Sequence, residues 1–159
     1  MRKRVIEAKV DRAISMLKEK DRYLIEYFLH EQSLSHRLAV YLENLFPKKY
    51  NVDCEYNKKM DIENNIVNKS VRKSPQLPAS ETRDIRPDIT IHKRGKNNRK
   101  SNLLVIQIKK KENLQDRNED IESLKELTDQ DGEYQYQYGL FLYVDNVTSE
   151  IKKRWFPED

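Results

Sequence analysis

The run LLVIQIKK, residues 103–110, constrains the fold of this chain more than any other segment. Five of its first six residues are apolar, and such a run between polar segments is typical of a strand buried on both faces. Side chains alternate between the two faces of a strand, so Gln107 and Lys109 lie on one face, about 6–7 Å apart. A buried strand with an amide and an ammonium on one face indicates either polar side chains that are hydrogen-bonded at the edge of a sheet or a functional site.

Three other segments have the pattern of strands. Residues 51–57, NVDCEYN, alternate apolar and polar side chains, which predicts a half-buried strand with Cys54 in the core. Residues 86–92, RPDITIH, are joined to the run at 103 by a basic turn, which predicts an antiparallel hairpin. Residues 138–144, YGLFLYV, predict a strand buried on both faces and parallel to a neighbour.

Helical periodicity covers much of the rest of the chain. Residues 5–29 repeat apolar side chains at spacings of three and four, with a break near Asp21, which we expect to cap a second helix. Residues 30–46, HEQSLSHRLAVYLENLF, predict a further helix that ends before a proline. Residues 118–130 predict an amphipathic helix, and residues 148–156, TSEIKKRWF, a short closing helix.

The order of these elements is helices followed by β–β–β–α–β–α, which predicts an α/β fold with a mixed sheet flanked by helices. The 159 residues are enough for one domain with a substantial core, and we expect a single domain over 1–159 with a helical extension at 1–30. Residues 58–84 are polar and lack a convincing period. We interpret them as a long polar loop that is either mobile and functional or contains short strands.

Composition narrows the partners and the compartment. The net charge of +4 and the pI of about 9.0 weakly favour an anionic partner. A single cysteine excludes a disulfide within the chain and favours a reducing compartment. No apolar run approaches the length of a membrane span, and no apolar segment follows the basic N-terminus. We therefore expect a cytoplasmic protein with no membrane partner.

Three polar side chains on the predicted hairpin indicate a chemical function. The register that puts its apolar side chains together also turns Asp88 to the face of Gln107 and Lys109. Carboxylate and amide oxygens suit a hard cation such as Mg²⁺, which is commonly bound together with phosphates. A neighbouring lysine can orient water or offset charge on a phosphate. The three residues therefore predict a site for phosphodiester hydrolysis.

The motif RPD, followed by QIK in a strand–turn–strand–helix setting, resembles the PD-(D/E)xK nuclease superfamily. The stretch from Glu31 to Val144 also resembles a group of small uncharacterised bacterial proteins with this restriction-endonuclease-like core. The resemblance implies metal-dependent cleavage of DNA with Mg²⁺ or Mn²⁺. It implies that Asp88 and Gln107 bind the metal with the carbonyl of Ile108, that Lys109 activates water, and that Glu31 completes the site.

Gln107 stands where the superfamily pattern has an acid, and loss of that charge leaves a second function open. The chain is then a weak or inactive relative that binds nucleic acid without cutting it. A protein-interaction adaptor, with the charged helices as its surface, is a third hypothesis. Many enzymes of this fold act as dimers, and the sequence leaves a homodimer open.

The turn between the two hairpin strands is strongly basic. It holds five cationic residues in eight positions: Lys93, Arg94, Lys96, Arg99 and Lys100. Such a turn is either a loop that contacts nucleic-acid phosphates beside the site or a solubilising loop tip. A similar choice applies to Glu31, because a glutamate in the first turn of a helix also complements the helix dipole.

Overall fold

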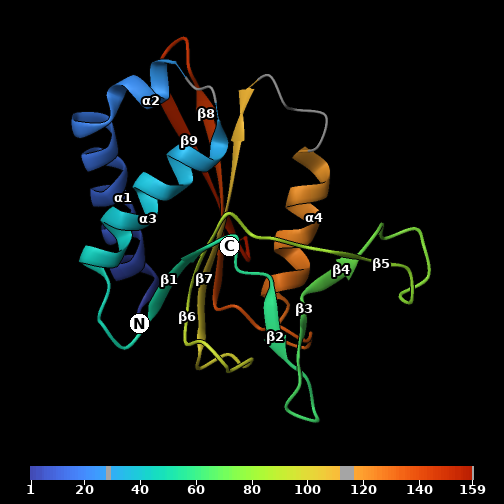
Figure 1. Cartoon of the computed structure of the whole chain (residues 1–159). Coiled ribbons are helices and arrows are strands. Elements are labelled where there is room, and N and C mark those ends of the chain that lie inside the picture. The colour runs from blue at the N-terminus through green and yellow to red at the C-terminus, as the bar shows by residue number, and fades with distance from the viewer. Residues whose placement is uncertain (28–29, 112–116, 159) are drawn as a thin grey trace.

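The computed structural model describes residues 1–27, 30–111 and 117–158. A five-stranded sheet with the order β1-β6-β7-β8-β9 forms its centre (Figure 1). The strands are β1 (Asn51–Cys54), β6 (Ile89–His92), β7 (Asn102–Lys110), β8 (Tyr138–Asp145) and β9 (Glu150–Phe156). Strands β7 and β8 run parallel and the other neighbours are antiparallel. The predicted mixed sheet and the parallel position of β8 are confirmed.

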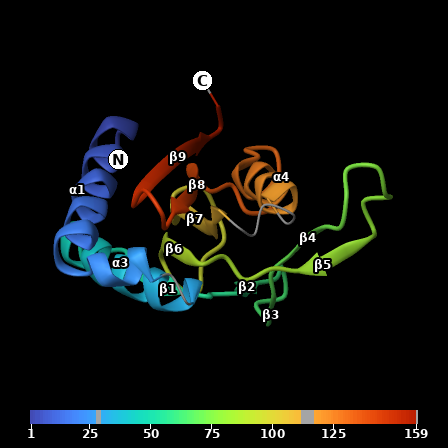
Figure 2. The ribbon, with the colours of Figure 1, turned by 90° about the horizontal axis from the view of Figure 1, so that it is seen from above.

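Helices cover both faces of this sheet. Three of them lie on one face: α1 (Lys3–Lys20), α2 (Arg22–Glu26) and α3 (Glu31–Leu45). Helix α4 (Arg117–Thr128) lies on the other face (Figure 2). Each face has its own core, because Ile106 and Ile108 pack towards α1 and α3, whereas Val105 packs with Leu124 of α4. The α/β class is therefore confirmed as a mixed sheet between two helical layers.

The pairing of β6 with β7 has the register expected from the apolar side chains. Ile89 lies opposite Ile106, and Ile91 lies opposite Leu104. All four side chains are fully buried and belong to the core beneath α1 and α3. A slip of one residue would turn this set out of the core beneath α1 and α3, so the apolar pattern favours this register. Asp88, which precedes β6, consequently comes to the level of Gln107.

The polar segment 58–84 contains short strands, the second of the two expected alternatives. Strands β2 (Lys58–Met60) and β3 (Ile66–Asn68) form one hairpin, and β4 (Ser70–Arg72) and β5 (Thr82–Asp84) form another. The hydroxyl of Tyr134 accepts a hydrogen bond from the Ser70 amide and donates one to the Ser70 carbonyl. Because Val71 is fully buried in the core beneath α4, the segment is anchored to the domain.

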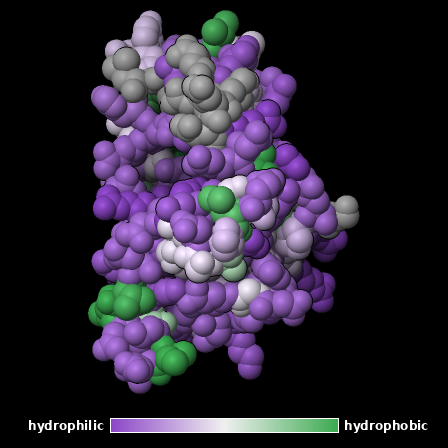
Figure 3. All heavy atoms as spheres, turned by 90° about the vertical axis from the view of Figure 1, so that its right-hand side faces the viewer, coloured by the Kyte–Doolittle hydropathy of each residue, from purple (hydrophilic) through white to green (hydrophobic). Residues whose placement is uncertain are grey.

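The outer face of the molecule on the side of these two hairpins is largely hydrophilic, with apolar side chains in small separate groups (Figure 3). This agrees with the mean hydropathy of −0.98 for the chain. Within the residues that the structure describes, no helix is both long and apolar enough to cross a membrane.

The closing helix predicted over 148–156 is wrong, because residues 150–156 form β9. The carboxylate of Asp145 accepts hydrogen bonds from the amides of Val147 and Thr148, and Ser149 adopts a φ of 57°. This tight turn brings the following residues alongside β8 over seven paired positions. Ladder hydrogen bonds with β8 therefore outweigh the weak helical pattern of the segment.

Two predictions for single residues meet different outcomes. Asp21 takes the expected N-cap position of α2, but its side chain makes no capping hydrogen bond, because its carboxylate accepts hydrogen bonds from Arg37 Nε and the Tyr41 hydroxyl of α3 instead. Cys54 is exposed rather than part of the core. It is the last residue of an edge strand, and the chain turns away at Glu55 with a φ of 51°.

Candidate functional site

Asp88 and Gln107 lie side by side where the β6–β7 ladder opens. The amide of Asp88 donates to Gln107 Oε1 at 3.4 Å, and Asp88 Oδ2 accepts a hydrogen bond from the Ile108 amide at 2.6 Å. Gln107 is 6% exposed. The structure therefore brings Asp88 next to Gln107 through the Asp88 backbone amide, and it places the Asp88 carboxylate on the amide of the following residue, Ile108.

Ile108 adds a backbone group to the same place. The N–H and C=O of one strand residue point to the same edge of the strand, as the paired bonds of an antiparallel ladder require. Since the Ile108 amide binds Asp88, its carbonyl faces the edge of β7 on which Asp88 lies. The chain thus offers a carboxylate, an amide oxygen and a backbone oxygen in one small region.

Lys109 reaches the site together with a residue that sequence reasoning missed. Its Nζ lies 3.3 Å from Oδ2 of Asp120, and the two side chains are 16% and 17% exposed. Asp120 lies in the first turn of α4. A signal was present in the sequence, because Asp120 lies four and seven residues before the buried Leu124 and Leu127. That spacing puts it on the inner face of the helix.

Glu31 begins α3 and is half-buried. Its negative charge raises the pKa of both Asp88 and Asp120, so its carboxylate belongs to the same electrostatic neighbourhood. Three carboxylates and the Lys109 ammonium therefore surround the end of the hairpin. The sequence leaves two roles open for Glu31, completion of the site or interaction with the dipole of α3. Its position in the first turn of α3 fits both roles.

Burial and like charges strongly perturb Asp88. Loss of hydration raises its pKa to about 7, and the carboxylates of Glu31 and Asp120 add to the rise. The Ile108 amide and the Lys109 ammonium oppose it. The pKa of Asp120 is also raised, mainly by burial, against the opposing charges of Lys109 and Arg83. A region with this excess of carboxylates is stabilised by an additional cation.

The oxygen atoms present fit a hard divalent cation that keeps several water ligands. Mg²⁺ is commonly held by one or two carboxylates together with substrate phosphates, and Asp88 with Gln107 and the Ile108 carbonyl offers that kind of set. In the described ranges no group of three or more His, Cys, Asp and Glu side chains could hold a metal ion.

Arg83 of β5 brings a second cation close to the acids. Its Nη2 donates to Ser123 Oγ of α4 at 2.8 Å and lies 3.8 Å from Glu119 Oε2. Its charge lowers the pKa of Asp120. Sequence reasoning did not identify Arg83, since its role depends on how the β4–β5 hairpin packs against α4.

The basic turn lies at the other end of the hairpin. Asp88 precedes the first residue of β6, whereas the turn at 93–100 follows its last residue (Figure 1). The four strand residues between Asp88 and the turn separate them by about 16 Å. Within the turn, Arg94 Nε donates to Asp53 Oδ2 at 2.8 Å. The idea that the turn lies beside the Asp88 site is therefore not supported by its position.

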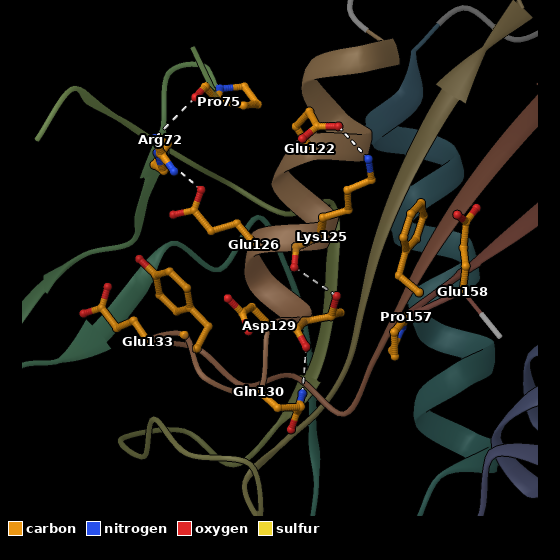
Figure 4. A pocket seen from close by; sticks show the side chains of 14 residues that line it. Arg72, Pro75, Glu122, Lys125, Glu126, Asp129, Gln130, Glu133, Pro157 and Glu158 are labelled. Carbon is orange, nitrogen blue, oxygen red and sulfur yellow. Dashed lines mark hydrogen bonds and ion pairs between the residues drawn. The ribbon is translucent and has the colours of Figure 1, made fainter. Parts of the chain in front are cut away.

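A pocket of about 750 Å³ lies at the C-terminal end of α4, away from these residues. Glu122, Glu126 and Asp129 project from the helix towards it, with Glu133 and Glu158 at its margins (Figure 4). None of the residues predicted for the site lines it. The chemistry expected from the sequence is thus gathered at the open end of the β6–β7 hairpin and not in this pocket.

Comparison of the chain with protein families, curated proteins and solved structures finds no match.

Proposed function

We propose that this chain hydrolyses phosphodiester bonds in DNA with a divalent cation, Mg²⁺ or Mn²⁺, and that its sheet is a restriction-endonuclease-like core. The observation that supports this most is the contact between Asp88 and Gln107, with Lys109 two residues further on the same face. An acid, an amide and an amine on paired strands match the order of the RPD and QIK motifs. Helix α4 and strand β8 follow in the order of that core.

Asp88, Gln107 and the Ile108 carbonyl would hold the cation. Such an ion polarises the phosphate and lowers the pKa of bound water. Lys109 Nζ can donate a hydrogen bond to the attacking water or to a phosphate oxygen. Asp120 holds this ammonium in place at 3.3 Å and favours its charged form. Glu31 acts on the same water or cation directly or through a water molecule.

A second function is binding of nucleic acid without cleavage. The specific observation that favours it is Gln107 itself, because the side chain that lies next to Asp88 at the proposed metal position is a neutral amide. Replacing a carboxylate with an amide removes a negative charge and weakens the affinity for a divalent cation. The two functions share the fold and differ in a single side chain.

Plasmid cleavage in Mg²⁺ or Mn²⁺ distinguishes these functions. The proposed nuclease cuts DNA as wild type, loses at least about 100-fold in rate as Lys109→Ala, and gains rate as Gln107→Glu. Lys152→Ala, on exposed β9, is the matched control for loss of a lysine, and Gln76→Glu is the control for gain of a carboxylate. Activity that appears only in Gln107→Glu favours the binder, and activity in neither protein contradicts the nuclease proposal.

A further inference from the structure

A second polar pocket lies between the β2–β3 hairpin and the basic turn. Its volume is about 110 Å³. The residues that line it are Tyr56, Lys58, Lys59, Met60, Ile66, Lys69, His92, Gly95, Lys96 and Asn97. Four are lysines, one is a histidine and none is acidic. These residues come from three separated parts of the chain, so the folded structure collects the cations.

Lys69 is the central cation of this pocket. It is 2% exposed, and its Nζ donates to the Tyr136 hydroxyl at 2.8 Å. The same ammonium lies 5.0 Å from the ring centroid of Tyr56 and 5.3 Å from that of Tyr136. Its hydrogen-bond partner is neutral, so the positive charge is held by a hydroxyl and two aromatic faces.

The nearby Asp53 is engaged by other cations. Its Oδ2 accepts from Arg94 Nε at 2.8 Å and lies 2.9 Å from His92 Nε2, and its Oδ1 accepts from Arg94 Nη2. The pKa of Lys69 is lowered to about 8, mainly by burial, against a rise caused by the charge of Asp53 and with a smaller lowering by Lys59. A buried lysine under this strain is stabilised when an anion enters beside it.

The other lysines leave the mouth of the pocket positively charged. Lys59 pairs with Glu133, and Lys58 donates to the neutral side chain of Asn68. Lys96 is exposed on the turn next to Gly95, whose φ is +72°. No heavy atom lies within 4 Å of the position that a Cβ of Gly95 would take, so the wall here is open to a ligand.

We propose that this pocket binds a phosphate group, either inorganic phosphate or the terminal phosphomonoester of a nucleotide chain. Lys69 and Lys96 place ammonium groups at this pocket, and a phosphate anion suits such donors. The volume of about 110 Å³ is below the ~150 Å³ of a cavity that holds one benzene ring, so a nucleotide would place its phosphate inside and its remainder outside. This site goes beyond the nuclease proposal, because Asp88, Gln107 and Lys109 do not line it.

The test is a titration of the full chain in EDTA at constant ionic strength, followed by the amide NMR signals of Gly95 and Asn97. Inorganic phosphate produces saturable shifts in wild type. Affinity falls at least about tenfold in Lys69→Met and about threefold in Lys96→Gln, and it is unchanged in the control Lys152→Gln. Lys96 is exposed, so its variant decides the outcome if Lys69→Met does not fold.

A short oligonucleotide with a 5′-phosphate, compared with the same oligonucleotide ending in a 5′-hydroxyl, distinguishes the two sources. Tighter binding of the phosphorylated oligonucleotide than of inorganic phosphate identifies a nucleotide terminus, and equal affinity identifies free phosphate. Shifts that do not saturate, or equal affinities of wild type and Lys96→Gln, overturn the phosphate site. Because EDTA removes divalent cations, this result is independent of whether the chain cuts DNA.

Discussion

At the scale of single residues, Asp88 combines a structural cost with a chemical role. Its carboxylate accepts one short hydrogen bond from the Ile108 amide, yet burial and two neighbouring acids raise its pKa to about 7. A buried charge without full compensation destabilises the folded state. Such a residue is retained where its function requires it, which agrees with a role in binding a cation.

The first prediction concerns the loss of folding stability caused by burial of the Asp88 carboxylate. The folded pKa of about 7 lies above the ordinary value of 3.8, so the folded state binds more protons between these values and stability falls as pH rises towards 7. In EDTA, Asp88→Asn therefore stabilises the protein by about 1–3 kcal/mol more at pH 8 than at pH 5. Urea unfolding measures this difference. An equal effect at both pH values would contradict the raised pKa.

The second prediction concerns Lys69, whose shift has the opposite sign. Its folded pKa of about 8 lies below the ordinary value of 10.5, so the unfolded state binds more protons between them and stability rises with pH. Between pH 7 and pH 9.5, wild type gains about 1–2 kcal/mol relative to Lys69→Met. Urea unfolding of both proteins in phosphate-free buffer checks this, and parallel pH profiles would argue against a buried charged lysine.

At the scale of elements, the β6–β7 hairpin was predictable and β9 was not. Ile89 and Ile91 alternate in step with Leu104 and Ile106, so the observed register places all four in the core beneath α1 and α3. The segment 150–156 contains only Ile151, Trp155 and Phe156 as large apolar residues. Those positions fit a helix stripe as well as a strand, and the pairing with β8 depends on the turn after Asp145.

The residues of the candidate site also divide into those that the sequence could place and those that it could not. Asp88 and Gln107 could be brought together from the sequence because strand alternation places them. Asp120 and Arg83 could not, since their contacts require the packing of α4 and of the β4–β5 hairpin. A tertiary contact between distant elements leaves only a weak local trace in the sequence, such as the stripe spacing of Asp120.

The third prediction concerns the contact between β8 and α4. A Cβ added at Gly139 would lie 3.0 Å from Thr128 Cγ2 and 3.3 Å from Phe156 Cβ. Helix and sheet approach closely there, so Gly139→Ala destabilises the fold by about 1–3 kcal/mol through overpacking. Thermal or urea unfolding measures the loss. A neutral effect would show that α4 can move away from the sheet at little cost.

The fourth prediction concerns the basic turn as an element. If it contacts DNA phosphates, the double variant Arg99→Gln, Lys100→Gln weakens binding equally for different sequences. The slope of log affinity against log salt then falls by about 1–2, since each lost contact removes close to one released counterion. Fluorescence anisotropy at several salt concentrations checks this. An unchanged slope would assign the turn to solubility.

At the scale of the whole molecule, the sheet has helices on both faces and two functional candidates at opposite ends of one hairpin. The acids and Lys109 gather where β6 begins, and the cationic pocket lies beside the turn where β6 ends. The spacing of about 16 Å along β6 is that of about five base pairs of duplex. A bound nucleic acid could therefore contact both regions of one molecule.

Anomalous scattering from a crystal of the chain soaked in Mn²⁺ shows whether Asp88 and Gln107 hold a cation. We expect a peak within about 2.3 Å of Asp88 Oδ and Gln107 Oε1, and its loss in Asp88→Asn. The absence of a peak at this position, or a Mn²⁺ peak only in the pocket at the C-terminal end of α4, contradicts the proposal that the β6–β7 hairpin holds a catalytic cation.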